Sequence, residues 1–253
     1  MLKCFATLSV VVMFCLSASF IAAVEKPLSD SEATAAIVEG KARVYKKGDT
    51  TGSALKQGDT IRKDSTIKVA EKSRVEILFP DGTIMRLSDK SQLVMNDIAY
   101  DRKSEGKNVK VNLSFGKVWA KVRKLVTPDS RVEVNTGNAV AGVRGTVYQV
   151  NVDEDKSALV KVYDGSVSVA SPPKEVAKPA TQVSGPVPVA GPHEVPPPQH
   201  EVSMEEWTVI VKAMQQISIS PQGVASKPQD FDARADADDW VKWNQERDKQ
   251  TQL

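Results

Sequence analysis

Basic and aromatic residues alternate with apolar ones in the segment KVWAKVR, residues 117–123. In an extended strand every second side chain lies on the same face. Such a face can stack a sugar ring or hold an anionic group through cation–π and charge contacts. It can equally be a solvated outer face whose tryptophan packs on a neighbouring turn. The residues of this candidate surface are Lys117, Trp119, Lys121 and Arg123.

The side chains that enzymes use are poorly placed for catalysis. Both histidines, His193 and His200, lie in a proline-rich segment, where no rigid frame can hold a base against a nucleophile. The chain has no phosphate-binding glycine loop and no His-Glu-x-x-His pair. The aspartates between Asp230 and Asp239 lack the spacing of a calcium loop. We therefore expect no enzymatic activity, no bound metal and no cofactor.

Residues 1–23 have the pattern of a secretory signal peptide, with a basic residue, an apolar run and small residues in order. We expect cleavage close to Ala23 and a periplasmic or secreted protein of the cell envelope. The apolar run is also long enough to cross a bilayer, so an inner-membrane anchor at residues 4–23 is the alternative. Cys4 and Cys15 lie inside this segment. Its removal leaves no cysteine for a disulfide, a metal site or a nucleophile.

Short apolar runs separated by turn residues recur from residue 36 to residue 170. This spacing is typical of a sandwich, barrel or solenoid rather than of βαβ units. Period-two alternation predicts that alternate residues face a core, whereas Arg131, Glu133, Gln149 and Asn151 face water. The predicted core residues of that stretch are Val132, Val134, Tyr148, Val150 and Val152.

Three turn signals punctuate this β region. The sequence from Phe79 to Gly82 favours a tight turn, because proline presets one backbone angle and glycine suits the last position. Asp164-Gly165, between two valine-rich runs, predicts a two-residue hairpin. Gly145, between Arg144 and Thr146, predicts a corner that a side chain would obstruct.

Residues 171–202 are rich in proline and predict a semi-rigid linker. The tail, residues 203–253, predicts two short helices. The first begins at a capping box at Ser203 and has an apolar stripe as far as Ile217; the second covers about residues 236–249. Two short helices have no core of their own, so we expect them to dock on the β region or on a partner. The candidate docking residues are Trp207, Trp240 and Trp243.

Charge is spread unevenly along the chain. Residues 36–170 contain 24 Lys and Arg against 17 Asp and Glu, a balance of 24 − 17 = +7. Residues 171–253 contain 8 against 12, a balance of 8 − 12 = −4. The asymmetry favours docking of the tail on the body or contact with an anionic envelope polymer. Export and an overall charge of only +2 argue against nucleic acid as a partner.

The segments 55–61 (LKQGDTI), 75–83 (VEILFPDGT) and 135–146 (NTGNAVAGVRGT) together resemble the FecR domain of bacterial envelopes. The resemblance covers about residues 36–170 and implies a twisted, β-solenoid-like stack of short antiparallel strands. It is closest to the exported branch of the family, although Gly137 replaces the usual proline.

In transmembrane members of the family, the periplasmic module receives a signal from an outer-membrane transporter, and a cytoplasmic region controls a sigma factor. Here the FecR-like residues begin within about fifteen positions of the export signal, which leaves no room for a sigma-binding segment, so we expect no sigma factor contact. The resemblance implies a protein-interaction or signalling module of the envelope. The alternative is a structural protein that binds envelope polysaccharide or peptidoglycan.

Overall fold

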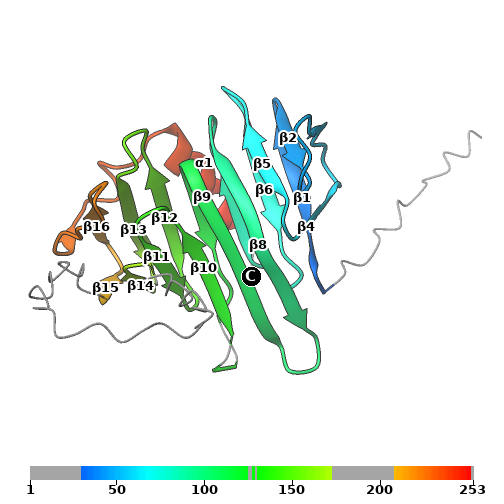
Figure 1. Cartoon of the computed structure of the whole chain (residues 1–253). Coiled ribbons are helices and arrows are strands. Elements are labelled where there is room, and N and C mark those ends of the chain that lie inside the picture. The colour runs from blue at the N-terminus through cyan, green and yellow to red at the C-terminus, as the bar shows by residue number, and fades with distance from the viewer. Residues whose placement is uncertain (1–29, 125–126, 129, 173–207, 252–253) are drawn as a thin grey trace, which may run out of the picture.

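The computed structural model describes residues 30–124, 127–128, 130–172 and 208–251. The predicted signal peptide, nearly all of the proline-rich linker, Ser203 and Trp207 lie outside these residues. The described chain is mainly β, as the sequence predicts, with 17 strands and one helix, α1 (Asp239–Gln250). Figure 1 shows the strands side by side in a broad curved sheet. The solenoid-like stacking stays a prediction.

The 17 strands join through one long strand, β9 (Gly106–Lys121), into a mixed sheet that folds into two layers. We call the layers sheet A and sheet B. Beside β9, sheet A contains β4 (Thr60–Arg62), β1 (Glu32–Glu39), β6 (Arg74–Leu78), β7 (Ile84–Leu87), β12 (Val147–Val152), β13 (Ala158–Asp164), β16 (Gln215–Ile219) and β17 (Gln229–Asp230). Sheet B contains β3 (Ser53–Ala54), β2 (Ala42–Tyr45), β5 (Thr66–Val69), β8 (Gln92–Asp101), β10 (Arg131–Asn135), β11 (Val140–Val143), β14 (Ser166–Ala170) and β15 (Thr208–Lys212).

Strand β9 belongs to both layers because it bends at Gly116. Phe115 still pairs with Gln92 of β8 in sheet B, whereas Gly116 pairs with Val152 of β12 in sheet A. Gly116 has a φ of +92°, and a Cβ atom there would lie 2.6 Å from the Cα of Ser91. Only glycine fits this conformation and this close approach. The bend turns the second half of β9 into sheet A.

The hydrophobic core lies between the two layers and draws apolar side chains from both. The predicted core residues, Val132, Val134, Tyr148, Val150 and Val152, are all buried there, which confirms the alternation. Along β9 the side chains that face the core have odd residue numbers before the bend and even numbers after it. They are Val109, Val111, Leu113, Val118 and Ala120.

The predicted first helix of the tail is wrong where the structure describes it. Residues 208–219 form β15 and β16, which extend sheets B and A. Val211 and Ile217 are fully buried in the main core. The valines and isoleucines here also alternate with period two, and these β-branched types favour strands over helices. The second predicted helix is confirmed by α1. Its N-cap is Asp238, whose carboxylate accepts a hydrogen bond from the Val241 N–H at 2.8 Å.

The Asp164-Gly165 turn exists, but the predicted hairpin is wrong. The strand before it, β13, pairs with β12 and β16 in sheet A. The strand after it, β14, pairs with β11 and β15 in sheet B. The turn therefore carries the chain from one layer to the other, a difference that the alternation of valines around it does not encode. The turn from Phe79 to Gly82 is confirmed, since the Gly82 N–H donates to the Phe79 carbonyl at 2.9 Å.

Candidate functional site

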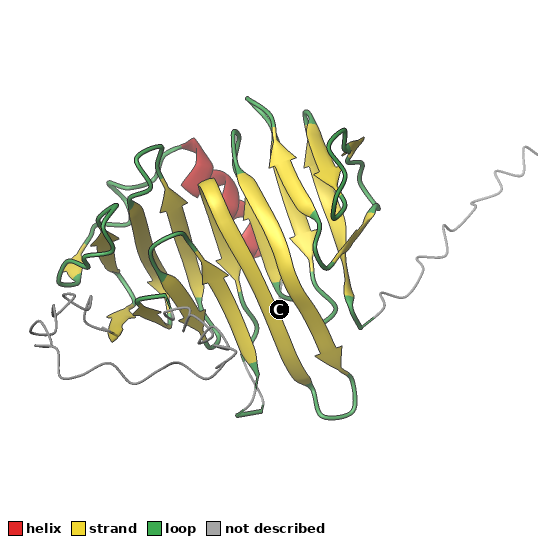
Figure 2. Ribbon diagram, in the orientation of Figure 1, coloured by secondary structure: helices red, strands yellow, loops and turns green. Residues whose placement is uncertain are grey.

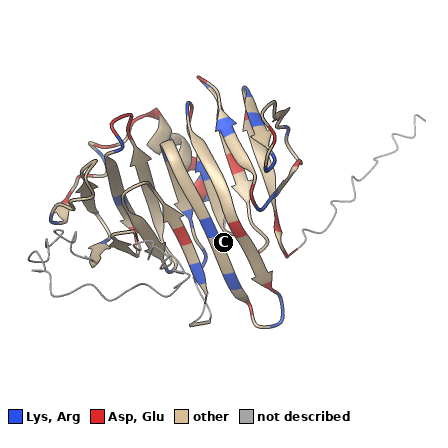
Figure 3. Ribbon diagram, viewed as in Figure 1, with Lys and Arg blue, Asp and Glu red and all other residues tan. Residues whose placement is uncertain are grey.

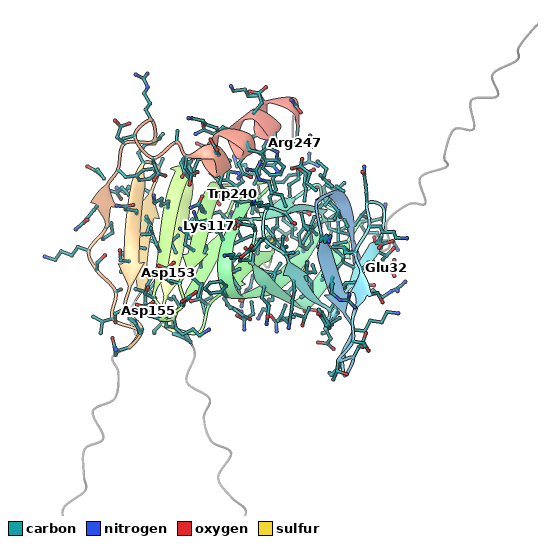
Figure 4. All side chains as sticks on the ribbon, turned by 90° about the horizontal axis from the view of Figure 1, so that it is seen from above. Glu32, Lys117, Asp153, Asp155, Trp240 and Arg247 are labelled. Atoms are coloured by element: carbon teal, nitrogen blue, oxygen red, sulfur yellow. The ribbon has the colours of Figure 1, made fainter. Side chains whose placement is uncertain are left out.

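Helix α1 and the segment before it cover the outer face of sheet A (Figure 2). Seen from above, the helix lies along one side of the strands, with Trp240 beneath it (Figure 4). Residues on five neighbouring strands stand in register as one row across this face: Glu76, Arg86, Trp119, Gln149 and Lys161. The prediction that Gln149 faces water is wrong: it is only 3% exposed and stands between Trp119 and Lys161, two residues that the tail contacts.

Arg86 is the central charge of this interface. Its side chain is fully buried, yet it lies on the outer face of β7. Its Nε donates to Glu76 at 2.7 Å, and its Nη1 donates to Asp248 of α1 at 2.6 Å. The second oxygen of the Asp248 carboxylate accepts from the Trp119 indole N–H at 3.0 Å. Charge-assisted hydrogen bonds of this kind are strong, and breaking one would take a partner from a buried charge.

Lysines of β9 meet both ends of α1. Lys121 donates to the carbonyls of Asp248 and Thr251, which belong to the last turn and the C-cap of the helix. These carbonyls have no partner within the helix, and a cation beside them is favoured by the helix dipole. At the other end, Lys117 lies 3.7 Å from the carboxylate of Asp238, the N-cap residue.

Aromatic packing completes the contact. Trp119 and Tyr163 of sheet A lie with ring centroids 4.5 Å apart, and Phe231 meets Tyr163 edge-on at 5.3 Å. Trp240 and Trp243 stack on each other at 5.6 Å on α1. These residues form a second hydrophobic cluster outside the main core. Aromatic pairs of this geometry stabilise beyond the area they bury.

The segment before α1 is held by Asp236. Its carboxylate pairs with Lys161 and accepts from the Tyr163 hydroxyl at 2.7 Å. Burial, and then the bond to the Asp236 carboxylate, raise the pKa of Tyr163 above its usual range. Tyr163 therefore stays neutral at physiological pH and donates a hydrogen bond to Asp236.

The structure thus brings together five of the seven residues singled out in the sequence. Lys117, Trp119 and Lys121 lie under the tail, and Trp240 and Trp243 belong to its helix. Arg123 lies past the end of β9 and is exposed in a separate cleft.

Sequence reasoning missed Glu76, Arg86 and Asp248. The first two flank the turn that begins at Phe79, so hairpin register places their opposite charges side by side, a signal that was available. Asp248 comes from 162 residues further along the chain than Arg86, and no local pattern links them.

The cleft that holds Arg123 has a volume of about 670 Å³ and lies beyond the end of β9. Three turns meet at it: the one that contains Asp81, the corner at Gly145 and the turn at Gly165. Gly145 has a φ of +69°, and a Cβ atom there would lie 3.1 Å from the Cα of Lys124. The predicted obstructed corner is therefore present, and it brings two chain segments close together at the cleft.

Basic residues outnumber acidic ones around the cleft. Lys107 and Asp81 form a buried ion pair, and Thr83 donates to the same carboxylate at 2.6 Å. Lys124 and Arg144 are exposed and make no ion pair with any other residue that the structure describes. Over the strands as a whole, acidic and basic residues are interspersed rather than gathered in one block (Figure 3). The cleft is thus a local concentration of free cations.

Residues 65–168 match the family model described as FecR protein. The chain contains a FecR domain. The matched FecR segment includes β9, the bend at Gly116 and all three turns of the cleft, but not α1 or the strands β15 and β16. Those tail elements complete the FecR domain's two layers and cover its outer face.

Comparison with curated proteins gave no match. Two crystal structures of a proposed anti-sigma factor from Parabacteroides distasonis are similar, with TM-scores of 0.44 and 0.43 and sequence identities of 16% and 17%. Each comparison covers 67% of this chain and 61% of the other, so this chain spans about three fifths of the length of those structures. Within the residues described here, no helix is long and apolar enough to cross a membrane. The same residues contain no group of three or more His, Cys, Asp or Glu side chains that could hold a metal ion.

Proposed function

We propose that this FecR-domain protein is a non-enzymatic interaction or signalling module of the bacterial envelope. The family match supports a role in signalling. The pattern of residues 1–23 supports export to the periplasm or the cell surface. Its partner in this proposal is an envelope protein, and the binding surface is the outer face of sheet A.

The observation that carries the proposal is the fully buried Arg86 on that face. A guanidinium on the outside of a sheet would normally face water; here α1 covers it and supplies Asp248 beside the strand partner Glu76. The face therefore binds a helix through a charged centre with tryptophans around it, the composition typical of interaction hot spots. A partner helix with a carboxylate and aromatic residues at matching positions would take the place of α1.

A second candidate function is the binding of an anionic envelope polymer. Sequence analysis had assigned it to the basic face of residues 117–123, and α1 covers most of that face. The cleft with the free cations Lys124 and Arg144 now supports this function.

Pull-down from two fractions distinguishes the two functions. The full-length protein, immobilised, is offered purified cell wall or detergent-solubilised envelope proteins. A variant with Trp240→Ala and Trp243→Ala weakens the cover of sheet A and substitutes no residue that lines the cleft. We expect the protein fraction to be retained, and its retention to change in the variant. Retention of cell wall alone, equal in both proteins, would rule out the helix-binding function and leave the second one.

Export is tested separately by N-terminal sequencing of the protein from fractionated cells. A mature terminus close to residue 24 in the periplasmic or secreted fraction is expected. An intact Met1 in the inner-membrane fraction would instead support the anchor at residues 4–23.

A further inference from the structure

The cleft beyond β9 is a second site that adjoins the face covered by α1, and Lys121 takes part in both. Its charged lining comprises Asp81, Glu105, Lys107, Lys121, Arg123, Lys124, Arg144 and Asp164. Five of these eight residues are basic and three are acidic, a balance of 5 − 3 = +2. A concave surface with one prevailing sign concentrates ligands of the opposite charge.

The charges inside the cleft divide into a satisfied pair and a free set. Lys107 and Asp81 neutralise each other where both are buried, and the Lys107 ammonium also donates to the Arg123 carbonyl at 3.3 Å. One guanidinium N–H of Arg123 donates to the Asp81 backbone carbonyl at 3.3 Å. Lys124 and Arg144 have no ion pair within the described residues, so their donors face the cleft and solvent.

The backbone holds the free cations close to one another. Gly145 packs against the backbone of Lys124, and Gly165 packs in turn against the carbonyl of Gly145. Both glycines have positive φ values, +69° and +81°. The three segments can approach this closely only without side chains, which fixes Lys124 beside Arg144.

The lining is poor in the groups that bind proteins. Its apolar members are Val122 and Val147, and its aromatic member is the half-buried Tyr100. Protein interfaces need a core of buried apolar and aromatic anchors. A sugar polymer needs a polar groove, cations for its acidic groups and an aromatic edge, and this cleft has all three.

We propose that the cleft binds an anionic glycan through Lys124, Arg144 and Arg123, which hold its carboxylate or phosphate groups. The proposal deepens the second candidate function and rests on it. Bidentate guanidinium contacts suit both kinds of oxyanion. The source of the charge is left to the experiment, because carboxylates and phosphates share this chemistry.

The test is isothermal titration calorimetry of the full-length exported protein at low and at physiological salt. The probes are an oligogalacturonate for carboxylates, a phosphomannan for phosphates, dextran as an uncharged polymer and an acidic peptide as an anion without sugar. The test variant is Lys124→Glu with Arg144→Glu. The matched control, Lys46→Glu with Lys47→Glu, makes a charge change of the same size on two exposed residues that do not line the cleft.

We expect one or both anionic probes to bind and the cleft variant to lose at least about tenfold in affinity, while the control stays within about twofold. Melting temperatures of all proteins are compared, and Lys124→Gln with Arg144→Gln replaces the test variant if that variant does not fold. Equal losses in the cleft and control variants would overturn the cleft while leaving polymer binding in place. No binding of any anionic probe, equal binding of dextran, or tighter binding of an acidic peptide than of either glycan would overturn the proposal.

Discussion

The two faces of β9 are covered in different ways. Its inner face contributes Val118 and Ala120 to an apolar core shared by both layers. Its outer face contributes Trp119 and Lys121 to an interface with α1 built from hydrogen bonds, ion pairs and aromatic rings. The inner face is held by area removed from water, and the outer face by specific partners. The first tolerates any well-packed apolar surface, whereas the second selects the helix that fits.

This difference predicts that deleting the strands that cover the inner core lowers stability the most. Truncation after Ala170 removes β15 and β16 and uncovers apolar residues of β13 and β14. We expect no cooperative melt and strong binding of a hydrophobic dye, as in a molten globule. Truncation after Asp230 removes only the outer cover and should still melt cooperatively, at a lower temperature. A cooperative melt of the shorter protein near that of the full chain would contradict the division into two kinds of cover.

Truncation of a single buried aliphatic side chain should have the next largest effect on stability. Ile77 is fully buried in the inner core, and Ile77→Ala should lower the free energy of unfolding by about 2–5 kcal/mol. Val241 of α1 is buried in the outer cluster. Val241→Ala should cost only about 1–2 kcal/mol, because release of the helix relieves the cavity. Chemical denaturation measures both, and a larger loss for Val241→Ala would show that the outer cluster is part of the core.

Breaking the charged centre of the outer face should cost about 1–3 kcal/mol. Asp248→Ala removes one carboxylate partner of the buried Arg86, which keeps Glu76, and removes the acceptor of the Trp119 indole. Hydrogen exchange should then show α1 opening well below global unfolding. The control is Glu246→Ala, whose exposed pair with Lys249 should be worth less than about 0.5 kcal/mol. Similar exchange in both variants would mean that Asp248 does not hold the helix.

The smallest expected effect is a loss of stability at high pH, which a different tyrosine reports for each face. Burial raises the pKa of Tyr148 in the core and of Tyr163 under the tail. A group whose pKa is raised on folding stabilises fully below its unfolded value of about 10, and this stability is lost as pH rises above it. We expect melting temperatures to fall from pH 9 to pH 11, and Tyr148→Phe to reduce that fall.

Tyr163→Phe tests the outer face under the same conditions. Between pH 9 and pH 11 its α1 should lose less protection than α1 of the parent protein, as read from hydrogen exchange or from tryptophan emission. At pH 8, Tyr148→Phe should leave stability within about 1 kcal/mol of the parent, because the Tyr148 hydroxyl has no partner among the described residues. If neither phenylalanine variant alters the response to pH, deprotonation of these tyrosines is not its cause.

How far the sequence predicts this structure depends on the range of each interaction. Alternation predicts the buried side of β12, and cap and charge signals predict α1, because these depend on neighbours in the chain. Alternation also marks Trp119 as facing away from the core, but it carries no information on what covers that face. The contact between Trp119 and Asp248 joins residues 129 positions apart, so only the folded chain shows it.

The tail strands show a different limit. In residues 208–219 the apolar positions fit both a helical stripe and a strand alternation. Tertiary structure decides between helix and strand here: without the tail, β13 and β14 would each have an unpaired edge, and β16 and β15 pair with these edges. Likewise, Asp164-Gly165 predicts a turn whose partner strands are set by the layers and not by the turn.

The double membership of β9 has a consequence for how the protein reaches its folded state. No described strand before β9 pairs with one after it, so among the described strands only β9, through its pairings with β7, β8, β10 and β12, joins the two halves by backbone hydrogen bonds. A chain delivered from its N-terminus therefore presents open strand edges until β9 arrives, and those edges are prone to aggregation. Because most residue contacts in the described chain join residues distant in the sequence, folding should be slow. Changes at the Gly116 bend should therefore lower the yield of folded protein as well as its final stability.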